Sequence, residues 1–215
     1  METPITTADS APLPRAAASA IHRIKAEHRA LACMLAAMQA LVMRYRERDS
    51  KPDYGLFESM LRYVEIVPDR LHHPKEDQVL FPAVRQHAHG EALVRELEQD
   101  HARGAPMLLE LRRAFHAFRS GETNALNQLA TAVDDFAEFY WWHMRKEEQQ
   151  LLPLALKHLP DADWQRVDSA FGDNTDPLFG AELTDEYRRL YQRITELTPK
   201  PLRSLLEGAA PGSTS

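Results

Sequence analysis

The chain has 215 residues, of which 44% are hydrophobic and 27% are charged, and this length favours one domain with extensions over two domains. Its formal net charge of -6 argues against nucleic acid or an anionic membrane as the main partner. The longest apolar run, residues 31–43, falls short of the roughly 20 residues of a membrane span, and the N-terminus lacks the pattern of a signal peptide. A single cysteine, Cys33, excludes an internal disulfide, so we expect a cytoplasmic protein.

The spacing of the hydrophobic residues predicts four long helices. Residues 1–17 are rich in proline and small residues and predict a flexible arm. The predicted helices cover residues 18–48, 54–89, 91–120 and 123–159. Because their connections are short, they should pack as antiparallel neighbours, which makes residues 18–160 an all-α, up-down-up-down four-helix bundle. No segment alternates with a period of two over a strand length, so no sheet is expected.

Prolines and glycines mark the remaining features of the chain. Pro68 and Pro74 interrupt the second predicted helix, where we expect a kink or local unwinding. Residues 161–197 form a predicted helical extension, with a short helix at 161–171, a loop at 172–180 and a last helix at 184–197. Residues 198–215 are predicted to be a disordered tail.

An internal repeat relates the two halves of the predicted bundle. Glu27-His28 on the first helix matches Asp100-His101 on the third. The segment from His72 to Pro82 matches the segment from His143 to Pro153, and each contains a glutamate four residues after its first histidine. Each half is therefore a helical hairpin with one histidine and then a His-x-x-x-Glu pair. Two such hairpins packed face to face have pseudo-twofold symmetry.

Six side chains of this repeat are predicted to face the bundle interior. Residues four apart lie on one face of a helix, and the single histidines lie in line with hydrophobic stripes. Buried carboxylates and imidazoles without partners are costly, and a metal ion would remove that cost. Four imidazoles and two carboxylates suit first-row transition ions, iron among them, and two facing carboxylates can bridge two cations. The candidate ligands are His28, His72, Glu76, His101, His143 and Glu147.

Each piece of this pattern alone has an ordinary explanation. A single histidine on a hydrophobic face is more often a core residue than a ligand, and one His-x-x-x-Glu pair is often a surface pair. The doubled pattern with matching offsets is what favours metal binding. Outside it, His73 points about 100° away from His72 and could either contact a ligand from behind or be solvated, and we favour solvation. Cys33 is expected to fill the core, while Tyr63 and Tyr140 are candidates to approach the site.

These motifs resemble those of the hemerythrin-like family, also called HHE cation-binding domains. The resemblance runs from about Ile21 to Pro160 and includes the segments Glu27-His28-Arg29, His72-His73-Pro74-Lys75-Glu76, Asp100-His101 and His143-Met144-Arg145-Lys146-Glu147. The segment Asp176-Pro-Leu-Phe-Gly180 resembles the region that follows this domain in bacterial members. The resemblance implies a four-helix bundle with two carboxylate-bridged, non-haem irons per chain. It further implies that the ligands are His28, His72, His101 and His143 and that the bridges are Glu76 and Glu147.

Two positions depart from the oxygen-carrying hemerythrins. Those proteins place a second histidine one turn after the ligand on the third helix, where this chain has Ala105. Their fourth helix has a histidine, four residues and then an aspartate, where this chain has His143-x-x-x-Glu147. The implied centre has fewer protein ligands and more symmetry. It is more similar to the branch linked to repair of iron centres under nitrosative stress, although the short arm lacks the Cys-containing domain that those proteins often carry.

The sequence favours a non-haem di-iron protein that binds or senses dioxygen or nitric oxide. The alternative is an enzyme-like protein that donates iron to iron–sulfur centres damaged by nitrosative or oxidative stress, or that reduces nitric oxide. A third hypothesis gives the metal only a structural role, with the 184–197 helix serving dimerisation. The sequence leaves open whether the chain is an enzyme and whether it has a redox partner or forms a homodimer. Neither nucleic acid nor a membrane is an expected partner.

Overall fold

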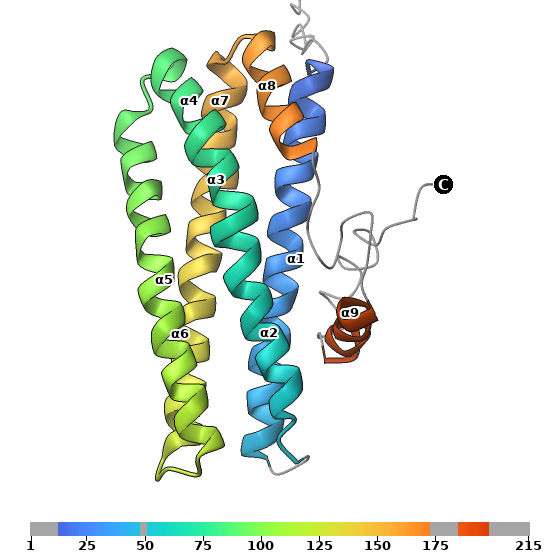
Figure 1. Ribbon diagram of the computed structural model, residues 1–215. Helices are drawn as coiled ribbons and strands as arrows, with labels where there is room; N and C mark the ends of the chain where they lie inside the picture. The colour runs from blue at the N-terminus through green and yellow to red at the C-terminus, as the bar shows by residue number, and fades with distance from the viewer. Residues whose placement is uncertain (1–12, 48–50, 173–184, 198–215) are drawn as a thin grey trace, which may run out of the picture.

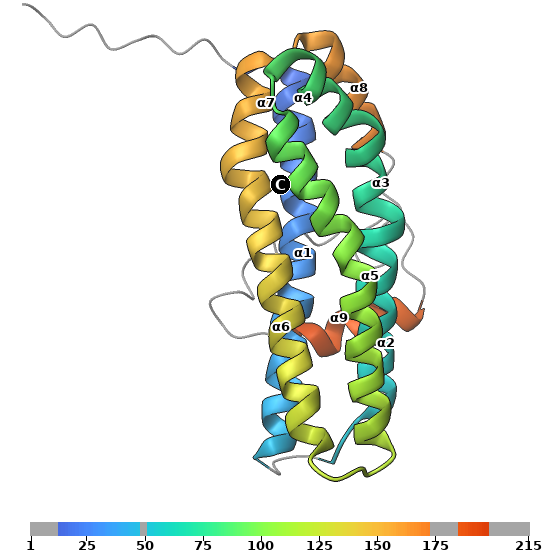
Figure 2. The ribbon, with the colours of Figure 1, turned by 90° about the vertical axis from the view of Figure 1, so that its left-hand side faces the viewer.

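The structure, a computed structural model, describes residues 13–47, 51–172 and 185–197. All elements in these ranges are helical, which confirms the all-α prediction for this part of the chain. The long helices form columns that lie side by side, and consecutive columns run in opposite directions (Figures 1 and 2). Most of the predicted arm, the predicted tail and most of the predicted loop at 172–180 lie outside the described residues.

Single helices form two of the columns, and shorter helical segments in series form the other two. The first column is α1 (Arg15–Arg46), and the third is α5 (Glu91–Arg119). The second combines α2 (Tyr54–Ile66), η1 (Val67–His72), α3 (His73–Lys75), η2 (Glu76–Leu80) and α4 (Phe81–Ala88). The fourth combines α6 (Ala125–Lys146), η3 (Glu147–Leu151) and α7 (Leu152–His158).

The starts of the first two columns follow local sequence. α1 begins at Arg15, three residues before the predicted start, because the alanines at 16–18 are strong helix formers. The side chain of Asp53 accepts a hydrogen bond from the Leu56 N–H at 3.0 Å and so caps α2.

Prolines widen the second column instead of breaking it. The local unwinding expected at Pro68 and Pro74 takes the form of a π-helical turn, η1, through which the chain stays helical. The N–H of His73, directly before Pro74, donates to the carbonyl of Pro68, five residues earlier. A proline ring clashes with the carbonyl four residues before it, and the wider π turn relieves that clash.

A π-helical turn also begins at each of the two candidate glutamates. The N–H of Phe81 donates to the carbonyl of Glu76, and the N–H of Leu152 donates to the carbonyl of Glu147. Both donors directly precede a proline in the sequence. The two glutamates therefore begin corresponding π turns, η2 and η3, in the two halves of the molecule.

Two hydrophobic clusters fill the space between the columns. One extends from Leu31, Val67, Leu108 and Met144 toward the α5–α6 connection. The other lies at the opposite end, around residues such as Ile24, Leu80, Leu97 and Leu151. The candidate ligands lie where the residues of one cluster give way to those of the other along each column, so a polar layer divides the core.

Two shorter helices pack on the outside of the columns. α8 (Asp161–Gly172) lies against α1, and its buried residues Trp164, Val167 and Phe171 join the second cluster. α9 (Asp185–Leu197) contacts α1 and α2 lower down, as Figure 1 shows. None of the described helices combines the length and apolar character that crossing a membrane requires.

Candidate metal centre

The six residues singled out by the sequence lie in one layer across the four columns. α1 brings His28, α5 brings His101, and the other two columns each bring a histidine and a glutamate. The potential ligand atoms form two groups of four, and within each group all atoms lie within 4.8 Å of one another. The groups are His28, His72, Glu76 and Glu147, and Glu76, His101, His143 and Glu147. Each group could hold a metal ion, and the two groups share both carboxylates.

In the first group, the Nε2 atoms of the histidines point inward. His28 Nε2 lies 3.1 Å from Glu147 Oε2 and 3.1 Å from His72 Nε2. His72 Nε2 in turn lies 3.4 Å from Glu76 Oε1. Two donor atoms bound at about 2.1 Å to one ion at a right angle are about 3 Å apart. The observed spacing between these atoms therefore fits coordination to a common ion.

The second group contains polar atoms without partners. His101 Nε2 lies 3.6 Å from Glu76 Oε2 and 3.8 Å from Glu147 Oε1, too far for hydrogen bonds. Among the described residues, ten buried side-chain N and O atoms lack a hydrogen-bond partner, and seven belong to the layer. These seven are on Glu76, His101, His143 and Glu147. Glu76 is 0% and Glu147 1% exposed, so water does not compensate them. Imidazole nitrogens and carboxylate oxygens are donors for first-row transition ions, so the residues present fit a metal.

A second set of carboxylates holds the outer side of the histidines. His72 Nδ1 donates to Glu27 Oε2 at 2.7 Å, and His28 Nδ1 donates to Glu148 Oε1 at 3.0 Å. An ionised carboxylate can only accept, so each Nδ1 carries the hydrogen. In a neutral imidazole this leaves the Nε2 lone pair facing the layer, which is the state that binds metal.

The other half repeats this arrangement at corresponding positions. His101 Nδ1 donates to Asp77 Oδ1 at 2.9 Å, while His143 Nδ1 lies 3.8 Å from Asp100 Oδ2. Each outer carboxylate comes from the column before that of its histidine, and the fourth column reaches back to the first. The four contacts therefore form a closed ring around the layer. The sequence analysis named two of these carboxylates, Glu27 and Asp100, within motifs but gave neither a role, because their contacts are between columns.

Two lysines at corresponding positions of the repeat contact carboxylates of the outer ring. Lys75 Nζ lies 3.1 Å from Glu27 Oε1, and Lys146 Nζ lies 3.0 Å from Asp100 Oδ2. Each lysine directly precedes a candidate glutamate ligand in the sequence. The lysines offset the negative charge of these two carboxylates, which keeps them ionised and able to accept from the histidines.

The buried charges shift the pKa values of the layer. Burial alone would lower the pKa of His143, but the charge of Glu147 and the nearby carboxylates of Asp100 and Glu76 raise it to about 10. Burial likewise opposes the charged form of His72, yet the Glu76 carboxylate raises its pKa well above the ordinary value. Burial would raise the pKa of Glu147, but the surrounding imidazoles hold it well below its usual range. In the metal-free protein these imidazoles carry protons that a metal must displace.

His73 does not behave as the sequence analysis expected. It is buried, with 5% of its surface exposed, rather than solvated. The second column packs between α1 and α5, so His72 reaches toward His28 while His73 reaches toward His101. The rings of His73 and His101 stack with centroids 3.8 Å apart and planes 11° apart. Two adjacent residues of a bundle helix can both be buried when the helix has a neighbour on each side. The prediction from sequence assumed that only one face of the helix is buried.

A small pocket adjoins the layer on the side of the first hydrophobic cluster. Leu31, Val67, Pro68 and Met144 line it with hydrophobic surface, and Tyr140 lines it together with Glu27 and histidines of the layer. Its free volume is about 10 Å³, close to what a single water molecule needs. The pocket therefore holds at most one water molecule and has no room for an organic substrate.

Tyr140 reaches this position because Gly104 leaves room for it. A Cβ atom on Gly104 would lie 2.7 Å from the Tyr140 hydroxyl oxygen, which is closer than real contacts allow. The Tyr140 ring is parallel to that of His73, with centroids 6.2 Å apart. Of the two tyrosines considered from sequence, Tyr140 lines the pocket, while Tyr63 is buried in the first hydrophobic cluster.

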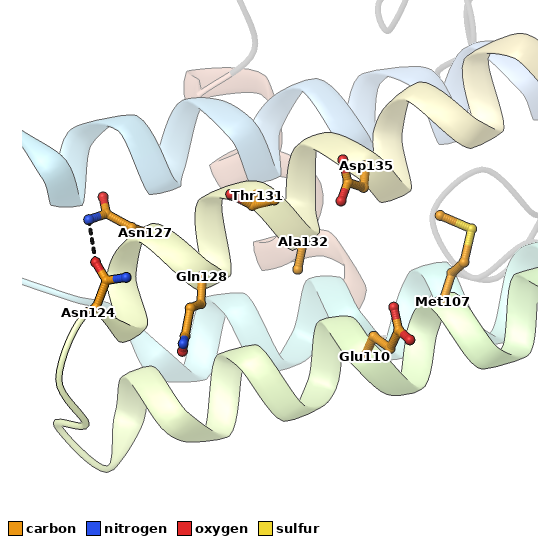
Figure 3. A pocket seen from close by; sticks show the side chains of 8 residues that line it. All are labelled: Met107, Glu110, Asn124, Asn127, Gln128, Thr131, Ala132 and Asp135. Atoms are coloured by element: carbon orange, nitrogen blue, oxygen red, sulfur yellow. Dashed lines mark hydrogen bonds between the residues drawn. The ribbon is translucent and has the colours of Figure 1, made fainter.

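A larger hollow lies elsewhere, between α5 and α6 (Figure 3). Its volume is about 340 Å³, and its lining includes Met107, Glu110, Gln128 and Asp135. None of its lining residues belongs to the layer or to the outer ring of carboxylates. The metal-ligand chemistry is therefore concentrated at the small pocket and not at the large hollow.

Comparison with known proteins agrees with this geometry. The family model of the hemerythrin HHE cation binding domain matches residues 19–155. Neither a search of curated proteins nor a search of solved structures gives a significant match. The matched range covers more than half of the chain and contains the whole layer, which confirms the resemblance seen in the motifs. This chain therefore belongs to the hemerythrin HHE cation-binding domain family.

Proposed function

We propose that the layer holds two carboxylate-bridged irons and that the protein binds or senses dioxygen or nitric oxide there. The proposal takes the four columns as an up-down-up-down four-helix bundle of the hemerythrin type, with the four histidines of the layer as terminal ligands. Glu76 and Glu147 are the bridges. The observation that carries the proposal is that two four-residue groups share both glutamates, beside a small pocket with a mainly hydrophobic lining.

The protein's own residues orient the ligand atoms and exclude solvent from them. Iron, when bound, supplies the electrons and the open coordination position that a diatomic gas needs. The outer carboxylates accept from Nδ1–H of His72, His28 and His101 and so keep the Nε2 atoms of these three histidines aimed into the layer. Leu31, Val67 and Met144 keep the pocket hydrophobic, which limits solvent access to the ligands.

The first test is elemental analysis of protein from iron-replete cells, with two irons per chain as the expected result. The diferrous protein should then give a new visible absorption with dioxygen or nitric oxide under anaerobic handling. Glu147→Ala should lose both the iron and the gas signal, whereas Glu138→Gln, on an exposed part of α6, should keep both. Two irons without any gas-induced absorption would contradict gas binding, and less than one iron would contradict the di-iron centre.

The near symmetry of the layer also favours the iron-donor alternative, because α1 and α5 each bring one histidine and the other two columns each bring one histidine and one glutamate. A donor should pass iron to a metal-free iron–sulfur protein and restore its activity, whereas a gas-binding protein should retain its iron. A purely structural metal would be indicated by a fall in melting temperature on chelation without any gas response.

A further inference from the structure

We propose that α8 is a lid over one side of the layer, and that metal ions enter and leave the layer where Phe171 covers Glu27 and Lys75. The inference rests on the layer holding metal, as proposed above, and adds how that metal is exchanged. It does not depend on which gas binds. α8 begins at Asp161, after the range that the family model matches, which ends at residue 155.

The far end of α8 reaches the outer side of the layer. α8 packs along α1 and also contacts α3 and η2 (Figure 1). The buried ring of Phe171 meets the His72 ring edge-on, with centroids 5.7 Å apart. Lys75 Nζ lies 5.1 Å from the centre of the same ring, within range of a cation–π interaction. Phe171 therefore contacts both a candidate ligand and the lysine beside its outer carboxylate.

Glu27 is the group that a metal ion crossing this side would meet. Its Oε2 accepts from His72 Nδ1 at 2.7 Å, and its Oε1 lies 3.1 Å from Lys75 Nζ. Both oxygens are therefore engaged while α8 is docked. Displacement of Phe171 removes the ring that holds Lys75, and one carboxylate oxygen becomes available directly outside the layer. Carboxylate oxygens bind divalent cations, so Glu27 can pass an ion into or out of the layer.

The corresponding lysine of the second half is held in a different way. Lys146 Nζ lies 3.0 Å from Asp100 Oδ2 and 3.5 Å from Glu96 Oε2. Both of these partners are on α5, which is one of the four columns. Lys75, in contrast, has a partner on a peripheral helix that can move without disturbing a column.

The start of α8 is anchored more firmly than the end that carries Phe171. A short link joins the start to α7, and Asp163 Oδ2, on a buried residue, lies 3.0 Å from His87 Nε2 on α4. Near the other end, Asp168 Oδ1 lies 3.3 Å from Arg23 Nε, and both side chains are partly exposed. Ion pairs in contact with water contribute little to stability. Opening at the Phe171 end is therefore a local event, which costs less free energy than unfolding of the columns.

Release of ferrous iron to a coloured chelator, measured under anaerobic conditions, tests the lid. Phe171→Ala should speed the release roughly tenfold or more, because loss of a buried ring raises the population in which α8 is open. Phe115→Ala is the matched control, since it removes an equally buried ring from the first hydrophobic cluster. It should leave the release rate unchanged.

A lock on α8 should have the opposite effect. Arg23→Cys combined with Asp168→Cys places two accessible thiols at the end of the lid, where a short bismaleimide can join them. The native Cys33 is buried and does not compete for the reagent. The cross-linked protein should release and load iron roughly tenfold more slowly than the same protein before cross-linking, with the same amount of iron bound at equilibrium.

The outcomes separate this inference from the function on which it rests. Equal exchange rates before and after cross-linking would overturn the lid, because metal would then pass elsewhere. Unchanged release in Phe171→Ala, or the same acceleration in Phe115→Ala, would also overturn it. These results leave the bound irons and the proposed function intact. Less than one iron per chain in the unaltered protein would overturn the proposed function and this inference together.

Discussion

The first hairpin, α1 to α4, and the second hairpin, α5 to α7, present the same ligand types from corresponding positions, but the residues beside the ligands differ. Three residues after the single histidine, the first half has Leu31 and the second has Gly104. Three residues before the paired histidine, the first half has Asp69 and the second has Tyr140. The repeat thus fixes the metal-binding groups, while the neighbouring residues differ, and of these neighbours Leu31 and Tyr140 line the small pocket.

The outer ring also differs between the halves. On the first half, α8 brings Phe171 against the His72 ring, with centroids 5.7 Å apart, and Lys75 Nζ lies 5.1 Å from the centre of the Phe171 ring. The Lys75 side chain is 14% exposed, compared with 26% for Lys146 in the second half. Hydrogen bonds and ion pairs are stronger where water is excluded. The first half should therefore depend more on its outer carboxylate.

Loss of a bridging glutamate should damage both halves at once and gives the largest expected effect. Glu76→Ala removes a carboxylate that belongs to both four-residue groups. We expect metal content to fall below one ion per chain in elemental analysis, with helical content by circular dichroism retained. His116→Ala, at an exposed histidine, should keep its metal. One tightly retained ion would show that Glu76 serves a single half.

Substitutions of the outer carboxylates should weaken metal binding to different extents in the two halves. Glu27→Gln should weaken metal binding by roughly 10–100-fold, the usual cost of losing a partner behind a ligand histidine. Asp100→Asn should cost less, because Asp100 lies 3.8 Å from His143, whereas Glu27 lies 2.7 Å from His72. Chelator competition measures both constants. Equal losses of metal affinity would mean that the shorter and less exposed Glu27–His72 contact contributes no more than the Asp100–His143 contact.

A methyl group added at Gly104 should destabilise the second hairpin and leave the first unaffected. Gly104→Ala places a Cβ 2.7 Å from the Tyr140 hydroxyl and should destabilise the metal-free protein by about 1–3 kcal/mol in denaturant unfolding. Adding Tyr140→Phe removes that oxygen and should restore most of the loss. Gly55→Ala on α2, where the nearest atom would be 3.7 Å away, is the control and should not destabilise. No recovery in the double variant would place the strain elsewhere.

The pH dependence should have opposite signs with and without metal. The pKa of His143 is raised to about 10 in the fold from an ordinary 6.5. Its stabilising effect on the metal-free protein is therefore complete below about pH 6.5 and lost as the pH rises through about 10. We expect the melting temperature of the metal-free protein to fall over this range. Metal binding needs the neutral imidazole, so metal retention should instead weaken as the pH falls. A melting temperature that rises with pH in the chelated protein would contradict this assignment.

The sequence predicted the all-helical class and brought together the six residues of the layer, because helical spacing and the repeat both act within a single column. It could not place contacts that depend on how the columns are rotated against each other. The pairing of Asp77 with His101 and of Glu148 with His28 is of this kind. The burial of His73 is another case, since it depends on α5 lying beside the second column. The prolines predicted a kink or local unwinding but not which of the two, because sequence rules do not distinguish a kinked helix from a π turn.

The π turns also determine which side chains of the second and fourth columns face the core. Buried residues in the second column recur at steps of four, at His72, Glu76, Leu80, Val84 and Ala88. An α-helix repeats every 3.6 residues, so each such step overshoots a full turn by about 0.4 residue, and a straight helix would carry the later side chains round toward solvent. A π turn takes up extra chain without advancing the helix in the same proportion, and it absorbs that drift. The fourth column does the same at His143, Glu147, Leu151 and Ala155. Deleting one residue inside η2 or η3 would therefore rotate everything beyond the glutamate and not merely shorten the column.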